Sequence, residues 1–391
     1  MTKLQGNWSY PNSIHAGAGR VSELPQLCQQ LAMQAPLLIT DPVLATLPMV
    51  CSALDQCRQE GLRVGCFSEV QGNPTGSNVM AGVDAYRAGN HDGVIAFGGG
   101  SCIDAAKAVA LMVGQNRPLW DFEDVGDNWA RVNEASIAPI IAVPTTAGTG
   151  SEVGRAAMIT DQDNHIKRII FHPEMLPTLA ILDPELTTGL PPLLTAATGI
   201  DALSHNLEAL CSPSYHPMAE GIAMEGARLV KTYLPRAVMD GNDLEARMQM
   251  LVASSMGATA FQKGLGAMHA IAHPLGALYD AHHGMLNAIL MPYVLKANRE
   301  AINVRIERLS RYLDLTGAGF EPGFDGFLSW VLQLRQHLGI PHSLAAIEIE
   351  DIDANLVGLM AAADATASTN PILFDAQQYA ALFKDAVHGR L

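Results

Sequence analysis

The sequence lacks the marks of several protein classes. Its six cysteines in 391 residues show no CxxC spacing, and thiols scattered in this way are typical of a reducing compartment. No basic run occurs and the formal net charge is -15, which argues against a nucleic-acid partner. No apolar stretch approaches the ~20 residues of a membrane span, and the first residues lack the apolar segment of a secretory signal. We therefore expect a cytoplasmic protein without membrane or nucleic-acid partners.

The chain is rich in core-forming residues, because 49% of it is hydrophobic and only 16% is charged. Its 391 residues are enough for two domains with sizeable cores. In the first half, short apolar segments alternate with amphipathic helical patterns, which predicts a mostly parallel sheet with helices on both faces. The predicted strands are residues 35–40, 62–67, 93–97, 137–143 and 179–182.

Strand patterns nearly vanish after Pro192, and the remaining sequence has helical periodicity. We place a domain boundary at about residue 190, with an α/β domain over residues 1–189 and an all-α domain over residues 190–391. The predicted helices of the second domain are residues 193–210, 218–234, 244–260, 266–277, 299–313 and 326–338.

Two glycine-rich loops follow predicted strands. Residues 98–101 read GGGS, and Ser101 precedes Asp104 at the spacing of a capping box, which predicts that Ser101 caps a helix. Glycines there would let backbone amides approach a phosphate closely. Residues 144–151, PTTAGTGS, would add hydroxyl donors from the next strand end. Each loop alone is also compatible with an ordinary turn, but two of them favour nucleotide binding.

The order of these features differs from the common dinucleotide fingerprint, since no GxGxxG follows the first strand. An acidic residue instead precedes the glycines, because Asp41 ends the first predicted strand. Its carboxylate could bind the ribose hydroxyls of NAD and repel the 2′-phosphate of NADP. An Asp before Pro42 is equally common as the start of a turn, so both interpretations stay open.

The second half contains a candidate metal site. Asp201 and His205 lie four residues apart, as do His269 and His273, and His283 follows. Residues at this spacing share one face of a helix, so each pair can direct two donors at one point. One carboxylate with three imidazoles suits iron(II) or zinc and suits magnesium or calcium poorly. His273 would be a fifth ligand or a proton carrier.

Four stretches of the sequence resemble the iron-containing (group III) alcohol dehydrogenase family, and the resemblance covers essentially the whole chain. The last stretch is highly specific, whereas the glycine loop alone would not be. The stretches are GGGSCIDAAKAVAL (98–111), PTTAGTGSEV (144–153), ATGIDALSHNLEAL (197–210) and GLGAMHAIAHPLGALYDAHHG (264–284).

This resemblance implies an N-terminal dinucleotide-binding domain and a helical, metal-binding catalytic domain. It implies that the metal ligands are Asp201, His205, His269 and His283, which leaves His273 as the nearby catalytic histidine that is not a ligand. In this family, an acidic residue at the position of Asp41 is associated with the use of NAD as the cofactor. The implied cofactor-binding residues are Asp41, Asn73, Gly99, Gly100, Ser101, Asp104, Thr145, Thr146, Thr149 and Lys167.

The function that follows is NAD-dependent interconversion of a small-molecule alcohol and its aldehyde or ketone. The metal, iron(II) or else zinc, would polarise the substrate oxygen, and hydride would pass to the nicotinamide. A hydroxy acid is an alternative substrate, because Arg155 or Lys263 could meet a carboxylate. Arg155 could equally face solvent or the cofactor phosphates.

Two further alternatives belong to other functional classes. One is a lyase of the dehydroquinate synthase type, which shares the fold, NAD and a metal, and the other is a non-catalytic metal- or nucleotide-binding protein. The 144–153 and 264–284 stretches favour the dehydrogenase over the lyase. Family resemblance also implies a homodimer or a larger homo-oligomer.

Overall fold

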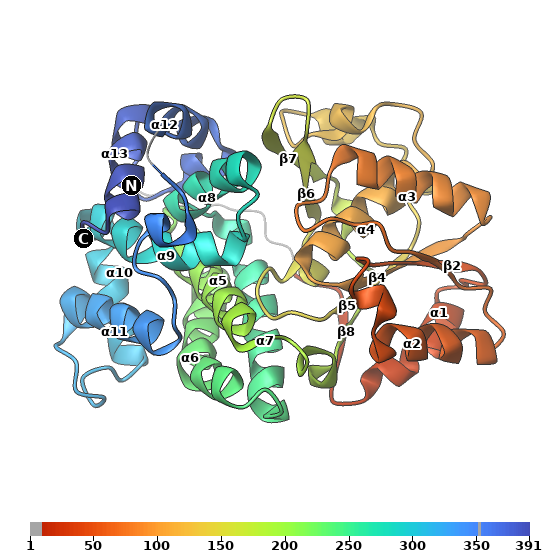
Figure 1. Cartoon of the computed structure of the whole chain (residues 1–391), viewed down its shortest axis with the longest axis horizontal. Coiled ribbons are helices and arrows are strands. Elements are labelled where there is room, and N and C mark those ends of the chain that lie inside the picture. The colour runs from red at the N-terminus through yellow and green to blue at the C-terminus, as the bar shows by residue number, and fades with distance from the viewer. Residues whose placement is uncertain (1–9, 351–352) are drawn as a thin grey trace. The chain divides into compact units, whose positions relative to one another are not determined.

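The computed structural model describes residues 10–350 and 353–391 (Figure 1). The first residues, on which the expectation of no secretory signal rests, lie outside the described residues. The chain forms two compact units. One includes Pro11–Thr146 and Gly150–Gly189, and the other includes Leu190–Leu391 with the short segment Ala147–Thr149.

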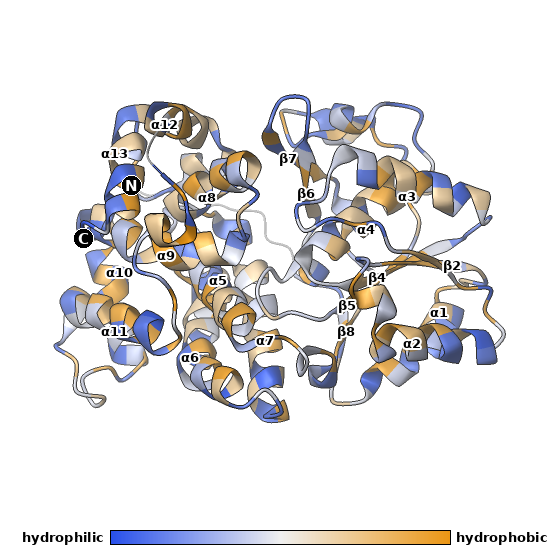
Figure 2. Cartoon of the chain, viewed as in Figure 1, coloured by the Kyte–Doolittle hydropathy of each residue, from blue (hydrophilic) through white to orange (hydrophobic). Residues whose placement is uncertain are grey.

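The first unit is built on a six-stranded sheet in the order β1-β8-β5-β4-β2-β3, in which every neighbouring pair is parallel. Its central strands are fully buried, and Figure 2 shows the hydrophobic colouring of β2. The strands are β1 (Ser13–Ala16), β2 (Pro36–Ile39), β3 (Gly65–Phe67), β4 (Gly93–Gly98), β5 (Ile140–Pro144) and β8 (Leu179–Leu182).

Both faces of this sheet carry a hydrophobic core, because successive residues of a strand point to opposite sides. In β4, Val94 and Ala96 pack in one core with α3 and α4, whereas Ile95 and Phe97 pack in another with α1 and α2. The predicted α/β class with helices on both faces is therefore confirmed. The helices are α1 (Leu24–Gln30), α2 (Pro48–Gln59), α3 (Gly76–Ala88) and α4 (Gly100–Met112).

A two-stranded antiparallel hairpin, which the sequence analysis did not predict, joins this unit. It consists of β6 (Ala156–Asp161) and β7 (Ile166–Phe171). In β6 every second residue is buried, which is the period of a strand with one covered face. Lys107 of α4 is buried and donates to the carbonyls of Ser151, Gly154 and Ala156, so α4 holds the start of the hairpin.

The second unit consists of helices, in agreement with the predicted all-α region. All six predicted helices are present, and three more occur where none was named. The helices are α5 (Pro192–Cys211), α6 (Pro217–Met239), α7 (Leu244–Ala260), α8 (Ala267–Tyr279), α9 (His283–Ala297), α10 (Arg299–Tyr312), α11 (Gly323–His337), α12 (Ala354–Ala363) and α13 (Ala376–His388).

A single large apolar core runs through this helical unit, and its helices carry both hydrophobic and hydrophilic faces in Figure 2. Helix α5 lies at the centre, because it packs against α6, α7 and α9. It is buried along almost its whole length after Thr195. Within the described part of the chain, no helix is long and apolar enough to cross a membrane.

Candidate metal centre and nucleotide site

Three helices of the helical unit bring the predicted metal ligands together. Helix α5 carries Asp201 and His205, α8 carries His269, and α9 begins at His283. Asp201, His205 and His269 are buried, and each offers one ligand atom within 4.8 Å of the others. The Nε2 atom of His283 lies 3.9 Å from Oδ1 of Asp201. All four predicted ligands therefore belong to one cluster.

Asn287, which the sequence analysis did not single out, lies among these donors. Its Nδ2 atom is 2.8 Å from Oδ1 of Asp201, 3.2 Å from Nε2 of His269 and 3.1 Å from Nε2 of His283. The NH2 group of Asn287 carries partial positive charge, and three atoms with lone pairs converge on it. A bound cation requires the same arrangement. The donor types also suit a first-row divalent ion. Asn287 lies one helical turn after His283, and that spacing was the signal that could have found it.

The environment of His205 leaves its Nε2 atom available as a ligand. Burial lowers the pKa of His205 to about 4, so the ring is neutral at pH 7, as a metal-binding imidazole must be. Its Nδ1 atom lies 3.2 Å from the carbonyl oxygen of Gly148. With the ring proton donated to that carbonyl, the lone pair is on Nε2.

His269 is oriented by a buried carboxylate from another helix. Oε2 of Glu208 on α5 lies 2.6 Å from Nδ1 of His269 and accepts the amide of Gly266 at 2.9 Å. Oε1 accepts the amide of Met268 at 2.7 Å. Burial by itself lowers the pKa of His269, but the charge and hydrogen bond of Glu208, with the charge of Asp201, outweigh it and raise that pKa. A carboxylate in this position fixes the ring and directs Nε2 toward the metal.

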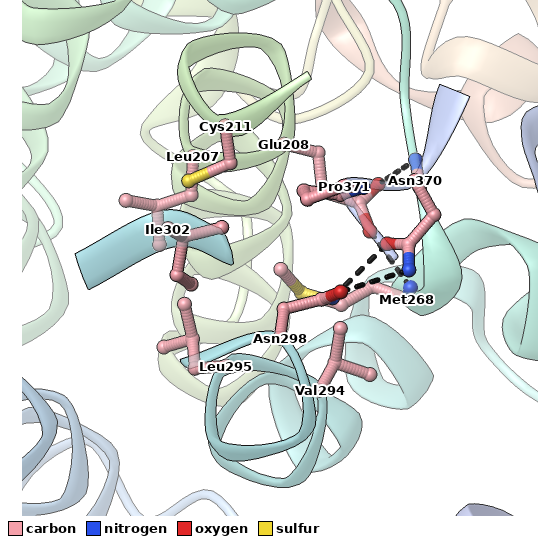
Figure 3. Close-up of a pocket in the computed structure, with 11 residues that line it drawn as sticks. Leu207, Glu208, Cys211, Met268, Val294, Leu295, Asn298, Ile302, Asn370 and Pro371 are labelled. Carbon is pink, nitrogen blue, oxygen red and sulfur yellow. Dashed lines mark hydrogen bonds between the residues drawn. The ribbon is translucent and has the colours of Figure 1, made fainter. Parts of the chain in front are cut away.

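The start of α8 has no capping side chain of its own, because its N-cap residue is Gly266. Partners from distant segments replace that cap: Glu208 binds two of the free amides, and Oδ1 of Asn370 accepts the amide of Ala267 at 3.0 Å. Asn370 also exchanges two hydrogen bonds with Asn298 at the end of α9, at 2.9 and 3.0 Å (Figure 3). These contacts fix the position of the helix that carries His269.

We expect Glu208→Gln to weaken metal binding by about 10- to 100-fold. Glutamine keeps the shape, but its amide nitrogen must face a buried N–H group, so one of the bonds around Gly266, Met268 and His269 is lost. Titration of the purified protein against a metal-binding dye measures the change. An unaltered affinity in a folded Glu208→Gln protein would show that Glu208 does not orient His269.

His273 lies next to the cluster and has a separate partner. Its ring stacks on the ring of His283 with centroids 5.5 Å apart and lies 5.8 Å from that of His269. Its Nδ1 atom is 2.8 Å from Oδ2 of Asp364. The sequence analysis did not identify Asp364.

Several predicted cofactor residues meet at one edge of the parallel sheet. Strands β2, β4 and β5 are neighbours, so their carboxyl ends lie at the same edge, where ligands bind in such sheets. Asp41 follows β2, Gly99 and Gly100 follow β4, and Thr145 and Thr146 follow β5. A side chain at Gly99 would contact that of Thr146.

Asp41 has one oxygen engaged in a turn. Its Oδ1 atom accepts the amides of Val43 and Leu44 at 2.8 and 2.9 Å, so the turn interpretation of Asp41 is correct. The Sγ atom of Cys102 lies 3.6 Å from Oδ2. A carboxylate oxygen has lone pairs beyond this one contact, so the ribose interpretation also stands as a prediction.

Ser101 does not cap α4, and that prediction was wrong. The N-cap residue is Gly99, and no side chain caps this end. Ser101 therefore lies inside the first turn, and its hydroxyl donates to the carbonyl of Gly72 at 2.5 Å. The next residue, Asn73, accepts from Nζ of Lys167 at 2.7 Å. The structure thus brings three predicted cofactor residues from distant parts of the sequence into one neighbourhood.

Asp104 is buried and bound within the α/β unit. It accepts the hydroxyl of Ser151 at 2.5 Å and the amide of Met158 at 2.9 Å, and Nζ of Lys107 lies 3.2 Å away. These bonds connect α4 to the hairpin. Thr149 groups with the helical unit rather than with the other predicted cofactor residues.

Lys263 is a buried helix-capping residue, which corrects the expectation that it could meet a substrate carboxylate. Its ammonium group donates to the carbonyls of Ala209, Leu210 and Ser212 at 2.7–3.0 Å, at the end of α5, and lies 3.2 Å from Glu220. A lysine has three N–H donors, so all of them are used. Arg155, by contrast, is partly exposed and lies over the ring of Phe171, 5.7 Å from its centroid.

Comparison with known proteins places this arrangement in a family. The model of the iron-containing alcohol dehydrogenase family matches residues 11–184, and that of the C-terminal part of the same family matches residues 195–387. The chain is 38% identical to 4-hydroxybutyrate dehydrogenase of Cupriavidus necator over 384 residues, which are 97% of this chain and 99% of that protein. It is 32% identical to the NAD-dependent methanol dehydrogenase of Bacillus methanolicus over 97% of this chain and 100% of that protein.

Solved structures give the same result. A 1,3-propanediol oxidoreductase with 32% identity superposes with a TM-score of 0.90 and covers 98% of this chain and 100% of its own. Sulfoacetaldehyde reductase of Bifidobacterium kashiwanohense, solved with NAD+, has 27% identity, a TM-score of 0.86 and coverage of 98% and 99%. With full-length matches in sequence and fold, and with buried Asp and His donors that suit a metal, the resemblance is confirmed: the chain is an oxidoreductase that belongs to the iron-containing alcohol dehydrogenase family.

Proposed function

We propose that this oxidoreductase interconverts a small alcohol and its aldehyde or ketone with NAD(H), and that Asp201, His205, His269 and His283 hold iron(II), or zinc in its place. The observation that carries the proposal is the buried cluster of Asp201, His205 and His269. The proposal that the cofactor is NAD is supported by Asp41 at the carboxyl edge of the sheet and by the NAD-dependent relative.

The residues in and around the cluster have separate roles in the proposed reaction. The carbonyl of Gly148 and the carboxylate of Glu208 accept hydrogen bonds from the Nδ1–H groups of His205 and His269, so the Nε2 lone pairs of both rings are directed to the metal. When bound, the metal supplies a Lewis acid for the substrate oxygen and NAD supplies the hydride acceptor. His273, whose ring lies beside those of His269 and His283, takes the proton that the alcohol loses, because imidazole is the most frequent general acid–base group in enzymes.

An ω-hydroxy acid is the second candidate substrate. Two observations favour it: one relative is a 4-hydroxybutyrate dehydrogenase with 38% identity, and Arg155 is a partly exposed cation in the α/β unit. A guanidinium pairs with a carboxylate through two parallel hydrogen bonds. Other relatives act on uncharged alcohols, as the names methanol dehydrogenase and 1,3-propanediol dehydrogenase state.

We expect measurable NADH formation by anaerobically iron-loaded protein from 1,4-butanediol, 4-hydroxybutyrate or both. Net NADH separates a dehydrogenase from a lyase of the dehydroquinate synthase type, in which NAD is regenerated in each turnover. Binding of NAD with no turnover of either compound would contradict the proposal.

The same assay chooses between the two substrate classes, because the two compounds differ mainly by one carboxylate. If the acid is preferred, Arg155→Leu should lower kcat/KM for the acid by about 10-fold or more and affect the diol less. Equal losses on both compounds would remove Arg155 from carboxylate recognition. We also propose a homo-oligomer, which light scattering on the purified protein tests.

A further inference from the structure

Asp364, at the start of the short helix Ala365–Thr369, joins the candidate site through His273. Its Oδ2 atom lies 2.8 Å from Nδ1 of His273. Its Oδ1 atom accepts the backbone amide of Thr366 at 2.8 Å and the hydroxyl of Thr366 at 2.5 Å. Each carboxylate oxygen therefore has a different partner, and the two donors of Thr366 fix which oxygen faces the histidine.

The three hydrogen bonds of Asp364 favour the ionised form of its carboxyl group. Burial by itself raises the pKa of Asp364, but the charge and hydrogen bond of His273 and the bonds from Thr366 outweigh it, so that pKa lies below its ordinary value. An ionised carboxylate only accepts hydrogen bonds. At 2.8 Å from Oδ2, Nδ1 of His273 is therefore the hydrogen-bond donor, and in the tautomer with its proton on Nδ1 the lone pair is on Nε2.

We propose that Asp364 is the positioning residue that holds His273 in the tautomer able to accept a substrate proton. The inference rests on the proposed function, in which His273 carries that proton. In alcohol oxidation the C–H bond breaks with its electron pair passing to NAD, and the O–H bond breaks with its proton passing to Nε2 of His273. Nδ1–H stays with Asp364, whose negative charge stabilises the imidazolium that forms.

The same arrangement occurs one turn earlier on α8, where Glu208 accepts Nδ1–H of His269. Two histidines on one helix face thus have their Nδ1 atoms bound by two separate carboxylates, the buried Glu208 from α5 and the partly buried Asp364 from the segment after α12. His269 thereby presents Nε2 as a metal ligand, and His273 presents Nε2 as a base.

The decisive variant is Asp364→Asn, which keeps the shape and inverts the hydrogen bonding. The two Thr366 donors select the amide oxygen, so the amide NH2 faces Nδ1 of His273 and makes that atom an acceptor. The ring proton then moves to Nε2, where it blocks proton uptake. We expect kcat to fall by about 100-fold with KM and metal content close to those of the unmodified protein.

Asp364→Ala separates this role from a merely structural one. Alanine removes the acceptor without imposing the wrong tautomer, so Asp364→Ala should retain more kcat than the isosteric Asp364→Asn. A structural role predicts the opposite order, because alanine leaves the larger defect. If Asp364→Ala folds poorly, the His273 tautomer in Asp364→Asn still tests the inference, because it needs no comparison with alanine.

A spectroscopic readout is independent of activity. In zinc-loaded, 15N-histidine-labelled protein, the His273 signals, assigned by their loss in His273→Gln, should show Nδ1–H in the unmodified chain and Nε2–H in Asp364→Asn. The Nδ1–H tautomer in both proteins, or unchanged kcat in Asp364→Asn, would overturn the inference. Unchanged kcat in His273→Gln would instead refute the proton-carrier role in the proposed function.

Discussion

Replacement of His269 by alanine is expected to remove the bound metal and to lower kcat by about 1000-fold or more. The change deletes one Nε2 donor from the buried cluster of Asp201, His205 and His269. It also removes the N–H group that the buried Glu208 binds at 2.6 Å, so this carboxylate keeps only its bonds to the amides of Gly266 and Met268. Both effects weaken the same site, so the loss should exceed that from any single cofactor contact.

The measurement is metal content by elemental analysis after dialysis, together with kcat under anaerobic iron loading. His337→Ala is the matched control, because His337 is an exposed histidine on α11 of the same unit. It should keep both metal and turnover. Normal metal content and normal kcat in His269→Ala would refute the proposed ligand set.

The second large effect is expected for Asp41→Gly, which should lower the preference for NAD over NADP by about 100-fold. The carboxylate lies after β2 at the carboxyl edge of the sheet. A negative charge there accepts hydrogen bonds from the ribose of NAD and repels the additional phosphate of NADP. Glycine removes both effects at once, so activity with NAD falls while activity with NADP rises.

The ratio of kcat/KM for the two cofactors measures this change. Asp55→Ala is the control, because Asp55 is an exposed aspartate on α2 of the same unit and alters the net charge equally. Asp41→Gly also loses the turn bonds to Val43 and Leu44, so thermal stability is measured in parallel. An unchanged ratio in a folded Asp41→Gly protein would show that Asp41 stabilises its turn and does not select the cofactor.

Local periodicity accounts for the parts of the fold that could be predicted from the sequence. The continuous apolar run at residues 93–97 predicted β4, and helical spacing predicted α5 through α8 closely. The sequence analysis missed strands without a continuous apolar run: β1 contains no buried residue, and the hairpin of β6 and β7 has polar positions on its open face. Strand pairing supplies the stability that these segments lack individually.

The candidate site likewise has a part that could be predicted from the sequence and a part that could not. The sequence by itself determined the donor residues, because Asp201 and His205, and likewise His269 and His273, are one helical turn apart and their spacing alone places them on one face. Only the tertiary structure decided what each ring nitrogen does. Glu208, Asp364 and Asn370 reach α8 from segments 60 or more residues away, and hydrogen bonds between distant segments leave no periodic pattern in the sequence.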